Sequence, residues 1–227
     1  MGAASPWNAG KALVPPPEGK TRQLVAPAPI TIDRVGADNE IIVPAGVRRI
    51  NAILIGGGGS GGRGDRTDYV LYPDYDSGGG GGSGAMVNIS FDVVPGERYI
   101  VRIGRGGDGP GGDTSILRNN IVYATAGGGR PGTSGNPGIG GAGGTPWANA
   151  NIISASWSEE KGRSGTNSVG TVRGGTGSGF GTSGAEGATS TVAAQNGEVP
   201  GGGGGGGTPE FRNGGKGMSG VARITWL

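Results

Sequence analysis

The chain has 227 residues, 57 of them glycine, and a formal net charge of +2 at pH 7. Hydrophobic residues make up 33% and aromatic residues 5%, against about 45–50% apolar residues in ordinary globular chains. The charged residues form no blocks, so we expect no nucleic-acid partner. Cysteine and histidine are absent, which excludes disulfides, thiolate metal sites and the usual general base. We therefore expect no cofactor and no metal.

Residues 1–40 are predicted to be an extended arm, because proline fixes φ and removes hydrogen-bond donors. Two interpretations stay open, an arm that attaches the chain to a virion partner and a passive linker. The residues proposed for attachment are Trp7, Pro15, Pro16 and Pro17. Residues 1–10 lack a basic segment followed by an apolar one, and no run of about 18 apolar residues occurs in the chain. We therefore expect neither a signal peptide nor membrane insertion.

From residue 41 onward, short apolar segments with period-2 alternation predict antiparallel strands. Residues 41–43 and 47–55 flank a turn and are predicted to form a hairpin. Residues 85–93 and 98–103 are predicted to form a second pair around the turn at 94–97. The apolar faces of these strands are expected to supply a small core.

Two further pairings are predicted. Residues 114–118 and 121–126 flank Asn119-Asn120, and asparagine tolerates the left-handed conformations that tight hairpin turns require. The chain ends in an alternating segment at 221–227, which we expect to pair with the strand at 48–55.

Glycine runs separate these strands, and the first, residues 56–62, follows an apolar strand directly. In the longest run, glycine stands at every third position from Gly129 to Gly144, which is the period of a polyproline II helix. Such a helix has no internal hydrogen bonds, so its amides need partners outside it. A packed lattice within one chain and a collagen-like triple helix between chains both provide them, and we place the intrachain lattice first.

The predicted fold is therefore mainly β and irregular, with short antiparallel strands, glycine-rich polyglycine or polyproline II-like segments and almost no helix. We divide the chain into the arm, 1–40, and a glycine-rich strand and loop domain, 41–227.

The order of strands and glycine runs resembles the glycine-rich domain of tailed-bacteriophage tail fibre and tail tip proteins. The resemblance covers about residues 41–227 and is carried by the strand and run at 50–62, the run at 78–84, and the motifs at 94–96, 101–107, 111–115 and 124–129. It implies a distal receptor-binding module, in some members built on packed polyglycine II helices, whose loops contact host surface proteins or glycans.

The segment 65–76 lies between two glycine runs and is the first predicted contact loop. Tyrosine offers a large amphipathic contact area at low entropic cost, and the aspartates suit basic or hydroxyl-rich partners. The candidate receptor contacts in this segment are Asp68, Tyr69, Tyr72, Asp74 and Tyr75. Alternatively, these tyrosines cover the scaffold or a neighbouring subunit.

The second predicted contact loop is residues 147–161, with Trp147 and Trp157 as candidate receptor contacts. Internal packing is the alternative for both indoles. Phe180 and Phe211 are further candidates on smaller loops, although an isolated aromatic residue in a glycine lattice also serves to fill a gap.

A glycoside hydrolase would need two acidic side chains that meet in space. The residues available in the two loops are Asp68, Asp74, Asp76, Glu159 and Glu160. Loops hold catalytic groups less accurately than strand ends, so we expect no enzyme activity.

We interpret the chain as a phage tail fibre or tail tip adhesin for a bacterial outer-surface protein or glycan. It would be assembled in the host cytoplasm and carried on the virion tail, with the arm on other tail proteins. The alternative is a structural tail, baseplate or connector component without receptor contact. A homotrimer and a single chain both remain open.

Overall fold

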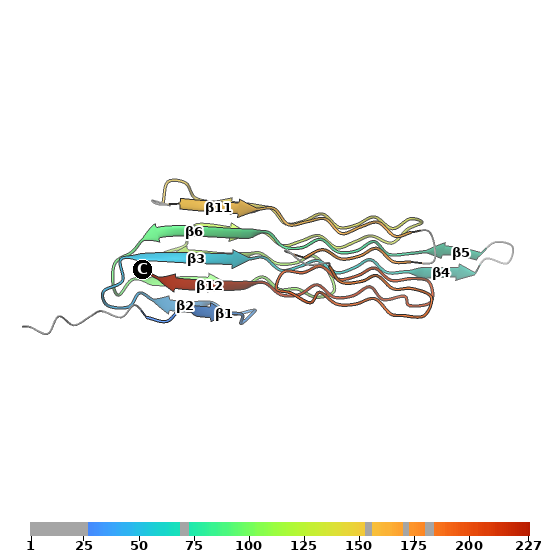
Figure 1. Ribbon diagram of the computed structural model, residues 1–227, viewed down its shortest axis with the longest axis horizontal. Helices are drawn as coiled ribbons and strands as arrows, with labels where there is room; N and C mark the ends of the chain where they lie inside the picture. The colour runs from blue at the N-terminus through green and yellow to red at the C-terminus, as the bar shows by residue number, and fades with distance from the viewer. Residues whose placement is uncertain (1–26, 69–72, 153–155, 170–172, 180–183) are drawn as a thin grey trace, which may run out of the picture.

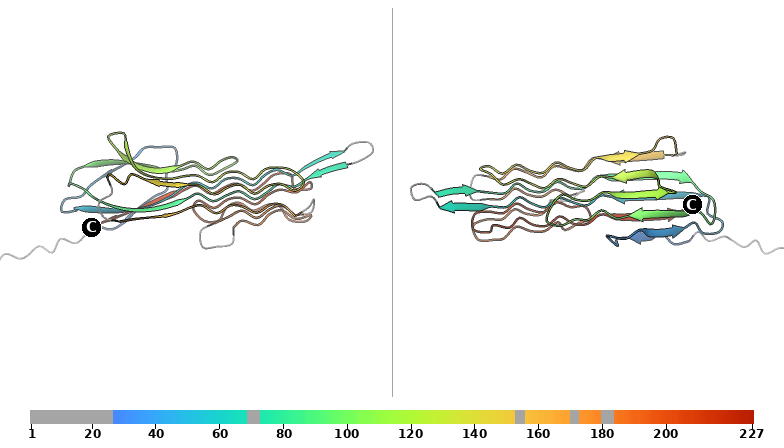
Figure 2. Two further views of the ribbon diagram at one scale, coloured as in Figure 1. Left: turned by 90° about the horizontal axis from the view of Figure 1, so that it is seen from above. Right: turned by 180° about the vertical axis from the view of Figure 1, so that it is seen from behind.

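The computed structural model describes residues 27–68, 73–152, 156–169, 173–179 and 184–227. A β-sandwich forms one end of the elongated molecule, and its strands continue into a bundle of glycine-rich segments (Figure 1). A two-stranded hairpin projects from the far end of that bundle, as the side views also show (Figure 2). The described residues contain strands and no helix, so none could cross a membrane as a helix. The mainly β prediction is confirmed.

Two five-stranded antiparallel sheets form the sandwich. In the described residues, the one further sheet is a two-stranded hairpin. Sheet A has the order β1 (Ile30–Ile32), β12 (Val221–Trp226), β3 (Arg49–Ile55), β6 (Met86–Asp92) and β11 (Ser156–Glu160). Sheet B has the order β10 (Pro146–Ala148), β9 (Ile121–Ala126), β8 (Thr114–Arg118), β7 (Arg98–Arg102) and β2 (Asn39–Ile42). The separate hairpin consists of β4 (Asp65–Asp68) and β5 (Pro73–Asp76).

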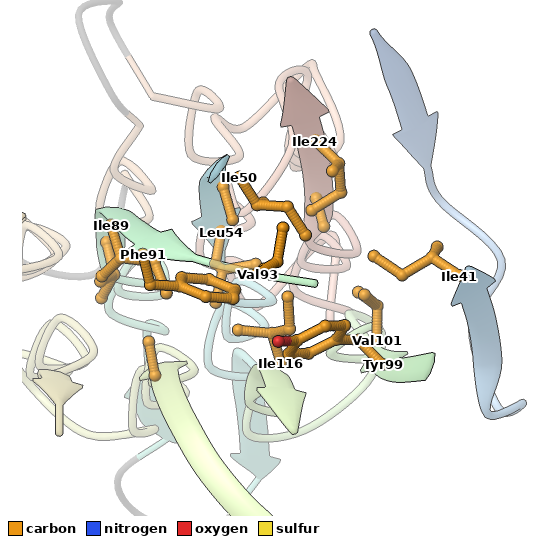
Figure 3. Packing of buried hydrophobic residues seen from close by; sticks show 14 of the residues in the cluster. Ile41, Ile50, Leu54, Ile89, Phe91, Val93, Tyr99, Val101, Ile116 and Ile224 are labelled. Atoms are coloured by element: carbon orange, nitrogen blue, oxygen red, sulfur yellow. The ribbon is translucent and has the colours of Figure 1, made fainter. Parts of the chain in front are cut away.

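The sandwich core is built from the alternating apolar faces that the sequence predicts, and Figure 3 shows them meeting between the sheets. At its centre, the Phe91 ring contacts the rings of Tyr99 and Tyr123, with centroids 5.5 Å and 4.9 Å away. Phe91 and Tyr99 are almost fully buried. The Tyr99 hydroxyl donates to Glu97 Oε2 at 3.0 Å, so its one polar atom keeps a partner inside the sandwich.

The first two predicted strand pairs are wrong, although both predicted turns exist. β2 pairs with β7 in sheet B, whereas β3 pairs with β6 and β12 in sheet A. The chain likewise crosses between sheets after β6, so β6 belongs to sheet A and β7 to sheet B. Each apolar face buries more surface against the opposite sheet than it could in a two-stranded hairpin, because a lone hairpin leaves one face in water.

The other two predicted pairs are confirmed. β8 and β9 form a hairpin, with Asn119 and Asn120 in the left-handed region at φ 50° and 62°. β12 pairs with β3 over its full length, from Val221 opposite Ile55 to Trp226 opposite Ile50.

The glycine runs form helices with three residues per turn, as the hydrogen bonds of residues 56–62 demonstrate. The amides of Gly56, Gly59 and Gly62 donate to the segment at 79–85. The next amide along the chain, that of Gly57, donates to a different segment, at Gly112 O, 2.9 Å away. The amide after it, of Gly58, donates to Met218 O at 2.8 Å. Successive amides thus point in three directions, which is the geometry of polyglycine II.

We call the packed set of these segments the glycine lattice. Its central helix, residues 78–84, is hydrogen-bonded to six surrounding segments of the same chain. It donates at 2.8–2.9 Å from Gly78, Gly79 and Gly80 to the carbonyls of Gly207, Thr133 and Thr166. The same three residues accept at 2.8–2.9 Å from the amides of Gly175, Gly62 and Gly141. The intrachain lattice is therefore the arrangement that the chain adopts.

Helices inside the lattice consist almost entirely of glycine, whereas helices at its rim also carry larger side chains. The uninterrupted run at 201–207 is buried throughout, as is the central helix. The helices at 127–133 and 138–144 lie at the rim, where Arg130, Thr133 and Ile139 point outward and are exposed. Interior helices therefore need a small residue on all three sides, and rim helices on only two.

The three-residue period from Gly129 to Gly144 belongs to two antiparallel helices and not to one. The chain turns at 134–137, with Gly135 at φ 150°, and the second helix returns beside the first. Arg130 N donates to Ala142 O at 2.8 Å, and Thr133 N donates to Ile139 O at 2.9 Å. The glycines keep their three-residue spacing through this turn, so the sequence pattern gave no indication that the chain reverses there.

Candidate functional site

The hairpin β4–β5 is the part of the described chain that extends furthest from the sandwich (Figures 1 and 2). Its register places Asp68 opposite Pro73, Thr67 opposite Asp74, and Arg66 opposite Tyr75. Three of the predicted contact residues, Asp68, Asp74 and Tyr75, are therefore in this hairpin. Tyr75 is partly exposed. Tyr69 and Tyr72 lie outside the described residues.

Neighbouring turns of the lattice hold the base of the hairpin on both sides. Before β4, Gly64 N donates to Arg212 O at 2.9 Å. After β5, Ser77 N donates to Gly135 O at 2.9 Å. The hairpin is thus fixed to two segments that are distant from it in sequence, and the lattice determines the direction in which it projects.

Phe211 lies in the turn that contacts the base of the hairpin. The turn is closed by Thr208, whose amide donates to Phe211 O at 3.0 Å and whose Oγ1 accepts from Phe211 N at 3.2 Å. Phe211 is partly buried, and its neighbours Glu210 and Arg212 are exposed. The structure therefore brings this predicted contact residue to the same end of the molecule as the β4–β5 hairpin. We call the hairpin and this turn, residues 208–213, the distal tip.

Trp147 and Trp157 do not belong to the distal tip, and both lie in strands instead of the predicted loop. Their role as receptor contacts stays a prediction. Trp147 is in β10 and Trp157 in β11, at the edges of sheets B and A. Both indoles are about half exposed, at 49% and 48%. The aromatic residues flanking glycine runs indicated a loop, but pairing with β9 and with β6 makes β10 and β11 strands of the sandwich.

The remaining predicted contacts lie outside the described residues. They are Trp7, Pro15, Pro16 and Pro17 of the arm, together with Phe180. Within the segment 27–40, Ile30–Ile32 forms β1 and pairs with β12, so this part of the chain joins sheet A.

The acidic residues considered for hydrolysis fall into two separate groups. Asp68, Asp74 and Asp76 lie in the β4–β5 hairpin at the distal tip, whereas Glu159 and Glu160 end β11 in the sandwich. The described residues contain no group of three His, Cys, Asp or Glu side chains placed to hold a metal ion.

A groove of about 890 Å³ lies on the flank of the molecule, beside Trp147. Three segments line it, at 110–113, 125–130 and 142–147. Hydrogen bonds place the segment 125–130 between the other two, so we call it the floor and the other two the walls. Asp113 and Arg130 contribute charged side chains to the lining. The sequence analysis did not identify these two residues, since three segments far apart in the chain form the groove and no local pattern marks it.

The fold and the distal tip together define a class of protein in which a backbone-bonded glycine scaffold, anchored in a β-sandwich, displays a hairpin. The chain belongs to the glycine-rich domain family, whose pattern it matches over residues 35–227. A comparison with curated proteins found no match.

Proposed function

We propose that this chain is a bacteriophage tail fibre or tail tip adhesin that binds a bacterial outer-surface protein or glycan through its distal tip. The observation that supports the proposal best is the position of the β4–β5 hairpin. It projects from the end of the lattice that is opposite to the C-terminal residue, Leu227 (Figure 1). An attachment protein needs this separation, because one end stays with the particle while the other reaches the cell.

The physical basis of the proposal is preorganisation. A binding loop loses conformational entropy when it is ordered, and a loop that is already held in place loses less. The hydrogen bonds of Gly64 and Ser77 fix both ends of the hairpin segment before any partner arrives. The tyrosines and aspartates of residues 65–76 then supply the aromatic and polar contacts that are common in recognition loops.

The rest of the proposal concerns assembly. The arm, with Trp7 and the prolines at 15–17, would contact other tail proteins, and the chain would join the virion in the host cytoplasm. The adhesin acts by binding alone, without enzyme activity, cofactor, nucleic acid or membrane insertion. A homotrimer and a monomer are both compatible with a lattice made by one chain.

A structural tail component is the second candidate. The observation that favours it is the half-exposed state of Trp147 and Trp157 on edge strands. Edge strands with exposed aromatic residues are suited to contact with a neighbouring subunit.

The test replaces Tyr69, Tyr72 and Tyr75 together by alanine in the purified chain. The wild-type chain is expected to bind host cells and to compete with adsorption of the parent particle, and the triple variant to lose both properties. Ile121→Ala is the matched control, since Ile121 is 54% exposed but lies in the sandwich. Full competition by a folded triple variant would contradict the role of the hairpin. A folded wild-type chain that binds no host cell would favour the structural component.

A further inference from the structure

The flank groove lies where sheet B changes into the glycine lattice. Strand β9 continues into the helix at 127–133, which forms the floor beyond Thr125. Five residue steps of about 3.1–3.4 Å each make the floor from Thr125 to Arg130 about 16 Å long. The two walls run beside this floor, since Gly111 N donates to Gly129 O and Gly127 N donates to Thr145 O. The groove therefore follows three neighbouring segments of the chain.

Trp147 stands on the outer face of sheet B, at the sandwich end of the groove. Its strand partner is Thr125, and cross-strand partners share a face of a sheet. Ala124 and Ala126, on either side of Thr125, are buried in the core, so Thr125 and Trp147 face outward. The indole is 49% exposed and offers a broad apolar surface to a molecule in the groove.

Two charged groups of opposite sign accompany the indole. Asp113 Oδ1 accepts from Gly128 N at 2.9 Å, so the backbone of the floor orients this carboxylate. Arg130 is exposed and has no ion-pair partner among the described residues. The groove lining thus holds one acidic and one basic side chain, both able to form hydrogen bonds with a ligand.

The floor between these side chains is bare because of the lattice. A Cβ atom at Gly128 would overlap the carbonyl of Gly111, and one at Gly127 would meet the carbonyl of Thr145. Glycine is therefore required at both positions by the neighbouring segments. The consequence for the surface is that no side chain covers the floor at Gly127 and Gly128, so a ligand can approach the backbone there.

We propose that this groove binds an oligosaccharide segment of a bacterial surface glycan. The face of a pyranose ring carries C–H bonds that pack against an indole, here that of Trp147. The hydroxyl groups of the sugar form hydrogen bonds with carboxylate and guanidinium groups, here those of Asp113 and Arg130. The volume is that of small-molecule sites, which combine an aromatic surface with a few fixed polar groups. Only the bacterial source of the glycan rests on the proposed function, since the groove is separate from the distal tip.

The experiment applies the full chain to an array of purified bacterial O-polysaccharides and capsular polysaccharides. Calorimetry with a fragment of the best-bound polysaccharide then gives the affinity. Trp147→Ala is expected to raise the Kd at least about tenfold. Trp157→Ala is the matched control, an equally exposed indole on an edge strand outside the groove, and is expected to leave the Kd within about twofold. Asp113→Asn keeps an acceptor for Gly128 N and is expected to weaken binding about fivefold through loss of charge.

Absence of binding to every polysaccharide on the array would overturn the proposal, and so would equal binding by the Trp147→Ala variant. Equal losses in the Trp147 and Trp157 variants would also overturn it, because the site would then not be this groove. The hairpin triple variant is expected to bind the array like wild type. If the hairpin triple variant still competes with adsorption while Trp147→Ala loses glycan binding, the proposed role of the tip is wrong and the glycan site is supported. If the triple variant loses adsorption while Trp147→Ala binds glycan like wild type, only the glycan site is wrong.

Discussion

The β-sandwich and the glycine lattice are built from continuous segments of one chain, yet different atoms hold them together. In the sandwich, side chains such as Phe91 and Tyr99 fill the space between two sheets. In the lattice, the backbone of the central helix contacts the backbones of six neighbours, and almost no side chain lies between them. The sandwich is held together by apolar side chains that fill the space between its sheets. The lattice is held together by backbone hydrogen bonds between helices that lie too close for side chains to fit between them.

This difference has a consequence for tolerance to mutation. A side-chain core adjusts to a change of one methyl group by repacking. The lattice has no such freedom, because the atoms that would have to move are backbone atoms already bonded to further segments. Adding one methyl group should therefore harm the lattice interior more than removing a whole side chain harms the sandwich.

The largest effect is expected for Gly81→Ala in the central helix. The new methyl group would overlap the carbonyls of Gly59 and Ser60, so at least one helix must move and break several hydrogen bonds. At about 1 kcal/mol for each bond plus the cost of unpaired buried groups, the loss is about 5 kcal/mol. Denaturant unfolding followed by circular dichroism measures it.

Gly109→Ala is the matched control for that substitution. Nothing lies within 4 Å of the position a Cβ would take there, and the carbonyl of Gly109 still accepts from Ser60 N. The expected change in the free energy of unfolding is below about 1 kcal/mol. If both glycine variants have the same stability, steric exclusion is not what specifies the lattice.

The second largest effect is expected for Phe91→Ala in the sandwich. This fully buried ring contacts two tyrosine rings, and its removal leaves a cavity that costs about 4 kcal/mol. The hairpin and the lattice should lose stability only through their connection to the sandwich. Hydrogen exchange checks this, since the amides of β3 and β6 should lose more protection than those of residues 201–207.

The third prediction concerns pH and separates the regions by chemistry. Burial, assisted by the hydrogen bond to Glu97, raises the pKa of Tyr99 well above its ordinary value of about 10. The folded state therefore keeps the proton longer than the unfolded chain. The contribution of the Tyr99 hydroxyl to the free energy of unfolding is fully present below about pH 10. Above that pH it falls by about 1.4 kcal/mol per pH unit. Tyr99→Phe should remove this part of the slope in unfolding measured from pH 9 to 11.

The smallest effect is expected at the rim of the lattice. Ile139 occupies the outward third position of its helix and is 60% exposed, so Ile139→Ser should change the free energy of unfolding by less than about 0.5 kcal/mol. Thermal unfolding of this variant beside Gly81→Ala tests whether the outward position alone accepts side chains. A large loss at Ile139 would mean that the rim is covered in the assembled protein.

Local patterns predicted the elements of the sandwich well and their partners only in part. The hairpin around Asn119-Asn120 was predictable because its turn chemistry is local. The pairs assigned to β2 with β3 and to β6 with β7 were wrong, since a turn between two strands has the same sequence whether the chain folds back in one sheet or crosses to the other. Of the candidate site, the hairpin segment 65–76 was predicted as a unit. The edge positions of Trp147 and Trp157 were not, because they depend on pairing with distant strands.

The sequence by itself determined that strands alternate with glycine helices of period three, and that the amides of those helices must find partners outside their own segment. The sequence also contains a pattern that correlates with burial in the lattice. Runs that are not interrupted by large side chains, such as 201–207, are buried. Only the tertiary structure decided which helices are neighbours, where the hairpin projects and that three segments enclose a groove. The reason is physical: one face of a polyglycine helix is chemically the same as the next, so its neighbours are chosen by the strands that continue into it.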